Sequence, residues 1–109
     1  MKITLSPMRR DDQLTLSKSG DTLTINGDVF DFSAIPEGAT LPRAAVDCDW
    51  LASDVERIDG VLYLTLILPH GARAPVETRF PAVLDLTTDG PVTLPAYDIP
   101  EVLPEELQP

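Results

Sequence analysis

The chain has 109 residues and a mass of 11.9 kDa, with 43% hydrophobic and 24% charged residues and a mean hydropathy near zero. This balance predicts one folded domain with a modest core. The formal charge of −10 argues against binding to nucleic acid or to an anionic membrane. The single cysteine, Cys48, excludes an internal disulfide and multi-cysteine metal sites.

The first third of the chain predicts short strands, because apolar residues alternate with polar ones. Strands are expected over residues 13–18, 22–25 and 28–32. Asn26-Gly27 between the last two tolerates the positive φ angles of a type I′ hairpin turn. Together with Ile3 and Leu5, these segments predict a three- or four-stranded meander. Its expected inner face consists of Leu14, Leu16, Leu23, Ile25, Phe30 and Phe32.

The middle of the chain predicts a loop followed by further strands. Residues 33–45 contain two prolines and a glycine, which favour an ordered crossing loop. Residues 46–52 alternate in polarity and predict a half-buried strand. After a turn at Asp59-Gly60, residues 61–68 are almost uninterruptedly apolar. This run predicts a central strand that is covered on both faces and ends at Pro69.

The last third predicts weaker strands and a tail. Residues 76–80 carry charges between prolines and predict an edge strand, and residues 83–87 and 92–94 predict a final hairpin. The predicted fold is therefore all-β, an antiparallel meander or small sandwich of consecutive hairpins. We expect a single antiparallel β domain over residues 1–97 and a flexible, acidic, Pro-rich tail over residues 98–109.

Few residues are candidates for catalysis. His70 is the only histidine, and a small hydrolase would need Cys48 and His70 within hydrogen-bonding reach in a cleft. The alternation instead places Cys48 on one face with Val46 and Trp50, which predicts a buried, unreactive thiol. No phosphate-binding loop, nucleophile elbow or HExxH motif occurs. We therefore expect no enzyme activity, no catalytic residues and no cofactor.

Acidic residues crowd the predicted hairpin between residues 47 and 59. Asp47, Asp49, Asp54, Glu56 and Asp59 could approach a cation such as calcium, but their spacing fits no EF-hand loop. A solvated outer face of the sheet explains them as well. We therefore expect no metal site.

Several residues are candidates for binding a protein partner. Tyr97 is an aromatic residue at the end of the predicted domain, and aromatic residues concentrate binding energy at interfaces. In the tail, apolar residues alternate with acids, which would suit a basic-rimmed groove or a sheet edge on another protein. The tail candidates are Val102, Leu103 and Leu107. A merely solvated tail is the alternative, and the oligomeric state is left open.

Four sequence blocks stand in a distinctive order and spacing: 35–42 (IPEGATLP), 54–60 (DVERIDG), 64–71 (LTLILPHG) and 78–81 (TRFP). In these blocks the chain resembles small proteins encoded by tailed phages and prophages, often near tail-fibre genes. The resemblance covers most of residues 1–94 and contains no catalytic or ligand motif. It implies a tail component or a tail-assembly accessory rather than a metabolic enzyme.

Two functions follow as expectations. The first is a non-enzymatic tail structural or tail-assembly module that binds a protein partner through a sheet edge, and through the acidic tail if that segment binds. The second is an acidic inhibitor that imitates nucleic-acid charge and blocks a DNA-binding protein. The N-terminal residues lack the apolar core of a signal peptide, so we expect the host cytoplasm, with association with the virion as the alternative.

Overall fold

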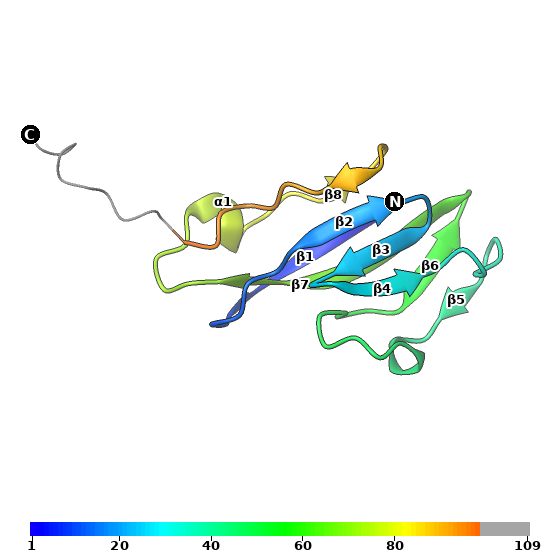
Figure 1. Cartoon of the computed structure of the whole chain (residues 1–109), viewed down its shortest axis with the longest axis horizontal. Coiled ribbons are helices and arrows are strands. Elements are labelled where there is room, and N and C mark those ends of the chain that lie inside the picture. The colour runs from blue at the N-terminus through cyan, green and yellow to red at the C-terminus, as the bar shows by residue number, and fades with distance from the viewer. Residues whose placement is uncertain (99–109) are drawn as a thin grey trace, which may run out of the picture.

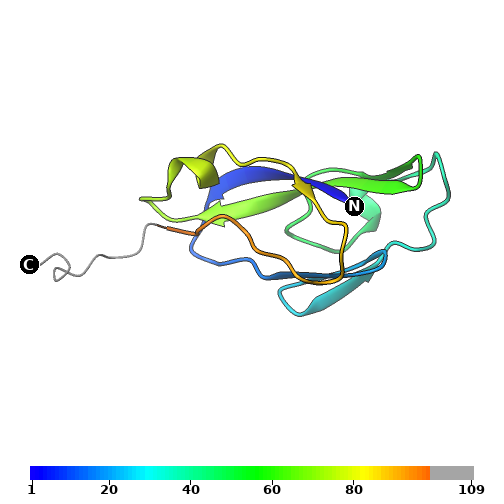
Figure 2. The same cartoon turned by 90° about the horizontal axis from the view of Figure 1, so that it is seen from above.

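The computed structural model describes residues 1–98, which fold mostly as β structure in two sheets (Figures 1 and 2). Sheet A has five strands in the order β5-β6-β7-β1-β8, and sheet B has four in the order β4-β3-β2-β9. The strands of sheet A are β1 (Lys2–Arg9), β5 (Thr40–Leu41), β6 (Val55–Ile58), β7 (Val61–His70) and β8 (Leu84–Asp85). Those of sheet B are β2 (Leu16–Ser19), β3 (Thr22–Ile25), β4 (Asp28–Asp31) and β9 (Gly90–Pro91). The all-β prediction is confirmed.

Two hairpins end in the turns that the sequence indicates. Ile25 lies opposite Asp28, so Asn26 and Gly27 form a two-residue loop, with φ angles of 49° and 87°. Both angles are positive, as a type I′ turn requires, and such turns match the twist of the flanking strands. The β6–β7 turn repeats this geometry, with φ angles of 52° at Asp59 and 78° at Gly60.

Strand β1 does not join the expected meander. It pairs in parallel with β7, from Lys2 opposite Tyr63 to Arg9 opposite His70, so Ile3 and Leu5 belong to sheet A. The prediction was wrong because parallel neighbours can be far apart in sequence when a crossover connects them. Here the chain between β1 and β7 first builds three strands of sheet B.

Strand β7 is central, as predicted, but its boundaries and burial differ from the prediction. It runs through Pro69 to His70, and every second residue from Leu62 to Leu68 is buried while the residues between them are half-buried. Only one face of β7 therefore packs against the core, instead of both faces being covered. The N–H of Ile67 donates to Trp50 on the side away from β1, so the missing N–H of Pro69, two residues later, costs no bond to β1.

Residues 46–52 do not form the expected strand. A short 3₁₀ helix, η1 (Arg43–Ala45), precedes this segment, and only Leu51 makes an isolated antiparallel bridge, to Leu66. Cys48 is half-buried rather than buried, whereas Leu51, expected on the outer face, is completely covered. The alternation matches the exposure of residues 46–50 but fails at Leu51. It also did not predict the pairing, because β6 already occupies the nearer part of the β7 edge.

Two predictions for the last third were wrong. Residues 76–80 form one turn of helix, α1 (Val76–Arg79), instead of an edge strand, and the buried Thr78 hydroxyl donates to the Ala96 carbonyl at 2.6 Å. The expected final hairpin is also absent, because β8 pairs with β1 in sheet A and β9 pairs with β2 in sheet B. Local patterns could not show that this segment passes from one sheet to the other.

The hydrophobic core lies between the sheets. Of the six residues expected on the inner face of the first strands, five are buried and Phe30 is partly buried. Sheet A contributes Ile3, Leu5, Val55 and the alternate leucines of β7. Within residues 1–98, no helix has the length and apolar character needed to cross a membrane.

Candidate interaction surface along strand β4

Strand β4 is the most open end of either sheet. The terminal strands β5, β8 and β9 each have two residues, whereas β4 has four and pairs, within residues 1–98, with β3 alone. Val29, at its centre, is 66% exposed. A longer unpaired edge is a template for a further strand.

The register of β4 defines which main-chain groups face outward. Ile25 and Asp28 close a two-residue loop and therefore form a hydrogen-bonded pair. Such pairs alternate along antiparallel strands, so Phe30 also directs its N–H and C=O toward β3. The N–H and C=O groups of Val29 and Asp31 consequently point away from the sheet.

An apolar groove runs beside this edge. It consists of two hollows of about 240 and 320 Å³ that share Asp31 and Leu41 as lining residues, and we call it the β4 groove. Ten of its thirteen lining residues are apolar. The lining comprises Val29, Phe30, Asp31, Phe32, Ala34, Ile35, Pro36, Ala39, Thr40, Leu41, Ala45, Val46 and Asp47. The groove lies between β4 and the crossing segment that leads to η1.

Carboxylates surround the β4 groove. Asp28, Asp47 and Asp49 line an adjoining hollow of about 210 Å³, and with Asp31 we call them the acidic rim. The main-chain N–H of Ser33, followed by its hydroxyl, holds the pKa of Asp31 below its usual range, so this carboxylate is charged at neutral pH. The rim therefore presents negative charge next to unpaired main-chain groups.

The wider charge distribution has the same sign. Nine of the eighteen acidic residues lie between residues 21 and 59, where the only cations are Arg43 and Arg57, giving this segment a formal charge of −7. Both guanidinium groups also donate to main-chain carbonyls, Arg43 to Leu51 at 2.8 Å and Arg57 to Ile35 at 2.6 Å. These hydrogen bonds hold both cations to the fold.

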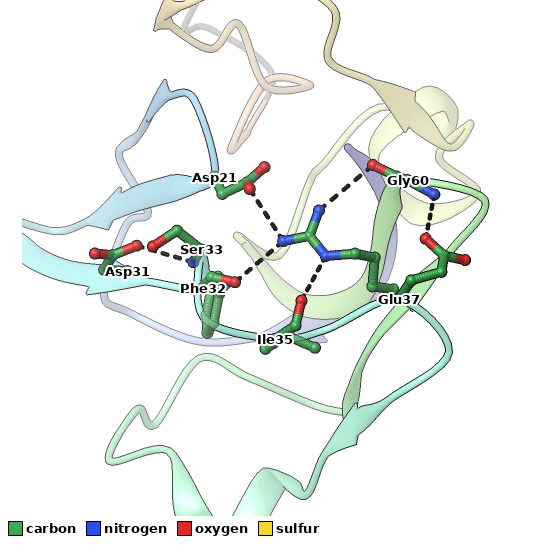
Figure 3. Close-up of polar contacts among 8 residues, drawn as sticks. Asp21, Asp31, Phe32, Ser33, Ile35, Glu37 and Gly60 are labelled. Carbon is green, nitrogen blue, oxygen red and sulfur yellow. Dashed lines mark hydrogen bonds and ion pairs between the residues drawn. The ribbon is translucent and has the colours of Figure 1, made fainter.

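Arg57 fixes the segment that borders one end of the groove (Figure 3). Arg57 lies on β6 in sheet A. Its guanidinium donates to the carboxylate of Asp21 at 3.0 Å and to the Phe32 carbonyl at 3.4 Å, and both of these acceptors lie outside sheet A. A weaker contact reaches the Gly60 carbonyl at 3.5 Å. Its side chain is only 13% exposed, so these bonds are largely shielded from water.

Glu37 holds the neighbouring hairpin turn (Figure 3). Its two carboxylate oxygens accept the main-chain N–H groups of Asp59 and Gly60 at 2.5 and 2.7 Å. Main-chain bonds of Arg57 with Gly38 and Ala39 hold the same segment against β6. The groove is therefore bounded by a loop with defined anchors.

The structure does not join the two candidate catalytic residues. His70 lies at the end of β7, and its Nδ1 is 2.9 Å from the Gly71 carbonyl oxygen. Cys48 lines the hollow inside the acidic rim. Within residues 1–98 no hydrogen bond links these two side chains, and no group of three or more histidine, cysteine or acidic residues is arranged to hold a metal ion.

Of the predicted partner-binding residues, Tyr97 is the one that the structure describes, and it lies away from β4. The Tyr97 hydroxyl donates to the Arg10 carbonyl, and its own carbonyl accepts the N–H of Gly71 at 2.7 Å, so this half-buried residue holds the chain against the body of the fold. Val102, Leu103 and Leu107 lie outside the described residues. The sequence analysis missed Val29 and Leu41. One signal in the sequence could have indicated them. The loop predicted after residue 32 means that the strand before it is not followed directly by another strand that could pair with its free edge.

Comparison with known proteins adds no assignment. No protein-family model, no curated protein and no solved structure matches the chain.

Proposed function

We propose that this chain is a non-enzymatic protein-interaction module of phage tail structure or assembly, and that it binds a protein partner along the β4 edge. The observation that carries the proposal is the four-residue terminal strand, with an exposed valine and outward main-chain groups, beside the β4 groove. The tail context rests on the resemblance of residues 35–42, 54–60, 64–71 and 78–81 to phage proteins. We place the protein in the host cytoplasm during assembly, with incorporation into the virion as the alternative.

Strand addition explains how such a surface would bind. Main-chain hydrogen bonds to an edge strand supply affinity, and hollows for alternate side chains supply specificity. The N–H and C=O groups of Val29 and Asp31 are the available main-chain partners. Because Arg57 and Glu37 anchor the bordering loop, the surface is already formed before binding.

The decisive experiment compares two valine-to-proline variants of the full-length, tagged chain. Val29→Pro removes an outward N–H and places the proline ring where an added strand would pair. Val76→Pro places proline at the first position of α1, where proline is tolerated. Both valines are exposed. We expect wild type and Val76→Pro to recover tail or fibre proteins from cells under prophage-inducing conditions, and Val29→Pro to lose them. Equal recovery by both variants would overturn binding at β4.

The charge distribution favours a second candidate function, inhibition of a DNA-binding protein by charge mimicry. The formal charge of −7 between residues 21 and 59 supports it. The same affinity experiment separates the two candidates. Specific recovery of a DNA-binding host protein, competed by DNA and retained by Val29→Pro, would place charge mimicry first.

A further inference from the structure

We infer that the partner contributes one extended segment with apolar side chains at alternate positions and lysine or arginine between or beside them, and that this segment becomes the fifth strand of sheet B. The inference rests on the proposed binding at β4 and adds the chemistry of the partner.

The strand count and the groove set the shape of the segment. Sheet A has five strands and sheet B has four, and sheet B ends at β4 beside the groove. A strand added there would lie about 4.8 Å from β4, and its side chains would alternate between the two faces of sheet B. Those on the inner face would meet Phe30, Leu41 and Val46, which are only partly buried. Apolar side chains at every second position fit this environment.

The acidic rim sets the charge of the segment. Asp28 and Asp31 lie on β4 itself, while Asp47 lines the groove, and no lysine or arginine lines it. Opposite charges on neighbouring strands stabilise the pair, and like charges destabilise it. Basic side chains on the segment would therefore increase both affinity and the rate of encounter.

The same charges disfavour the simplest alternative, a second copy of this chain. Because Val29 and Asp31 direct their main-chain groups outward, antiparallel pairing of β4 with β4 of another copy would set these outward residues opposite one another and gather Asp28 and Asp31 of both copies on one short ladder. These contacts would bring together four carboxylates with no cation from either strand. We therefore expect the segment to come from a protein of different composition.

Site-specific photo-crosslinking tests the inference in the full-length chain. The crosslinking residue p-benzoylphenylalanine replaces Val29 in one variant and the comparably exposed Val83 in the control, and adducts from producing cells are sequenced by mass spectrometry. We expect adducts specific to Val29 on a segment with alternating apolar residues and several lysines or arginines. A Val29-specific adduct on an acidic or uncharged segment, or on a second copy, would overturn this inference and leave binding at β4 intact. Absence of any Val29-specific adduct would overturn both.

A charge-matched pair of variants tests the electrostatic step. Asp28→Asn, Asp47→Asn and Asp49→Asn together remove three charges from the rim. Binding of the captured segment, as a synthetic peptide, should weaken by roughly 3- to 100-fold at low salt. The control removes three charges elsewhere, with Asp11→Asn, Glu77→Gln and Asp85→Asn, and should change affinity by less than about 2-fold. Equal losses in both variants would overturn the role of the rim.

Discussion

The two flanks of the sandwich are closed in different ways. On the β8–β9 flank, the chain itself passes from sheet A to sheet B: Leu86 exchanges hydrogen bonds with Met1 at the end of β1, and Val92 donates to Leu16 in β2. On the β4–β5 flank, the chain passes from sheet B to sheet A through the segment that Arg57 and Glu37 hold, and β4 pairs, within residues 1–98, with β3 alone (Figure 3). The fold thus protects the edges formed by β8 and β9 and leaves the edge of β4 available for pairing.

Edge protection follows the same division. Strands β8 and β9 are two residues long, and β9 contains Pro91, which cannot donate a main-chain hydrogen bond. Strand β4 has neither proline nor lysine, and only its two aspartates discourage pairing with like strands. Those charges would repel a second copy and would favour the basic partner that we propose, so the same two aspartates could limit self-association and select the partner.

Removal of the Arg57 side chain should have the largest effect on the open flank. Arg57→Met keeps the aliphatic stem but leaves the carbonyls of Ile35 and Phe32 and the carboxylate of Asp21 without this donor. We expect the free energy of unfolding to fall by about 2–4 kcal/mol, measured by urea denaturation. The matched variant Arg43→Met loses one side-chain hydrogen bond, to Leu51, and should cost about 1 kcal/mol. Equal losses would contradict the bridging role of Arg57.

Truncation of Glu37 should have a smaller effect at the same corner. Glu37→Ala removes the acceptors of the Asp59 and Gly60 N–H groups, and these exposed groups can turn to water instead. The expected loss is about 1–2 kcal/mol in urea denaturation. Glu77→Ala, at an exposed position without a side-chain hydrogen bond within residues 1–98, should change stability by less than about 0.5 kcal/mol. If Glu37→Ala left the free energy of unfolding unchanged, the turn would need no support from this side chain.

Proline at position 29 should cost little stability, because the lost N–H does not bond to β3. We expect Val29→Pro to lower the free energy of unfolding by about 1 kcal/mol or less. Amide hydrogen exchange in the wild-type chain checks the same geometry. The amides of Val29 and Asp31 should exchange at least about 100-fold faster than that of Phe30, which faces β3. Equal protection of all three amides would contradict an open edge.

The sequence predicted what local patterns determine. The alternation in β2, β3 and β4 located those strands and most of their buried residues, and Asn26-Gly27 located a turn, because both signals arise within a few residues. The parallel pairing of β1 with β7 depends on contacts about sixty residues apart and left no local trace. The β4 groove was also hidden, since it forms only when Leu41 and Val46 come to lie beside Phe30.

The most modest prediction concerns the closed flank, where Asp89 joins the β8–β9 segment to the β2–β3 turn. Its carboxylate accepts the Gly20 N–H at 2.9 Å and the Lys18 ammonium at 3.1 Å. The Gly20 hydrogen bond first, and Lys18 second, lower the pKa of Asp89 below its usual value of about 3.9. A pKa that is lower in the folded state adds stability above about pH 4, and this stability is lost as the pH falls through the folded-state pKa.

Asp89→Asn should therefore melt at a lower temperature than wild type near neutral pH, and the difference should close as the pH falls toward about 2. Differential scanning calorimetry across this range measures the change, with Asp85→Asn as a control on the same flank. Because Asp89 is exposed, added salt should reduce the difference near neutral pH. A difference that persisted unchanged in acid would mean that the flank is held by the neutral hydrogen bond to Gly20. In that case the acidic rim would be the place where we still expect charge to matter, through the proposed binding of a partner.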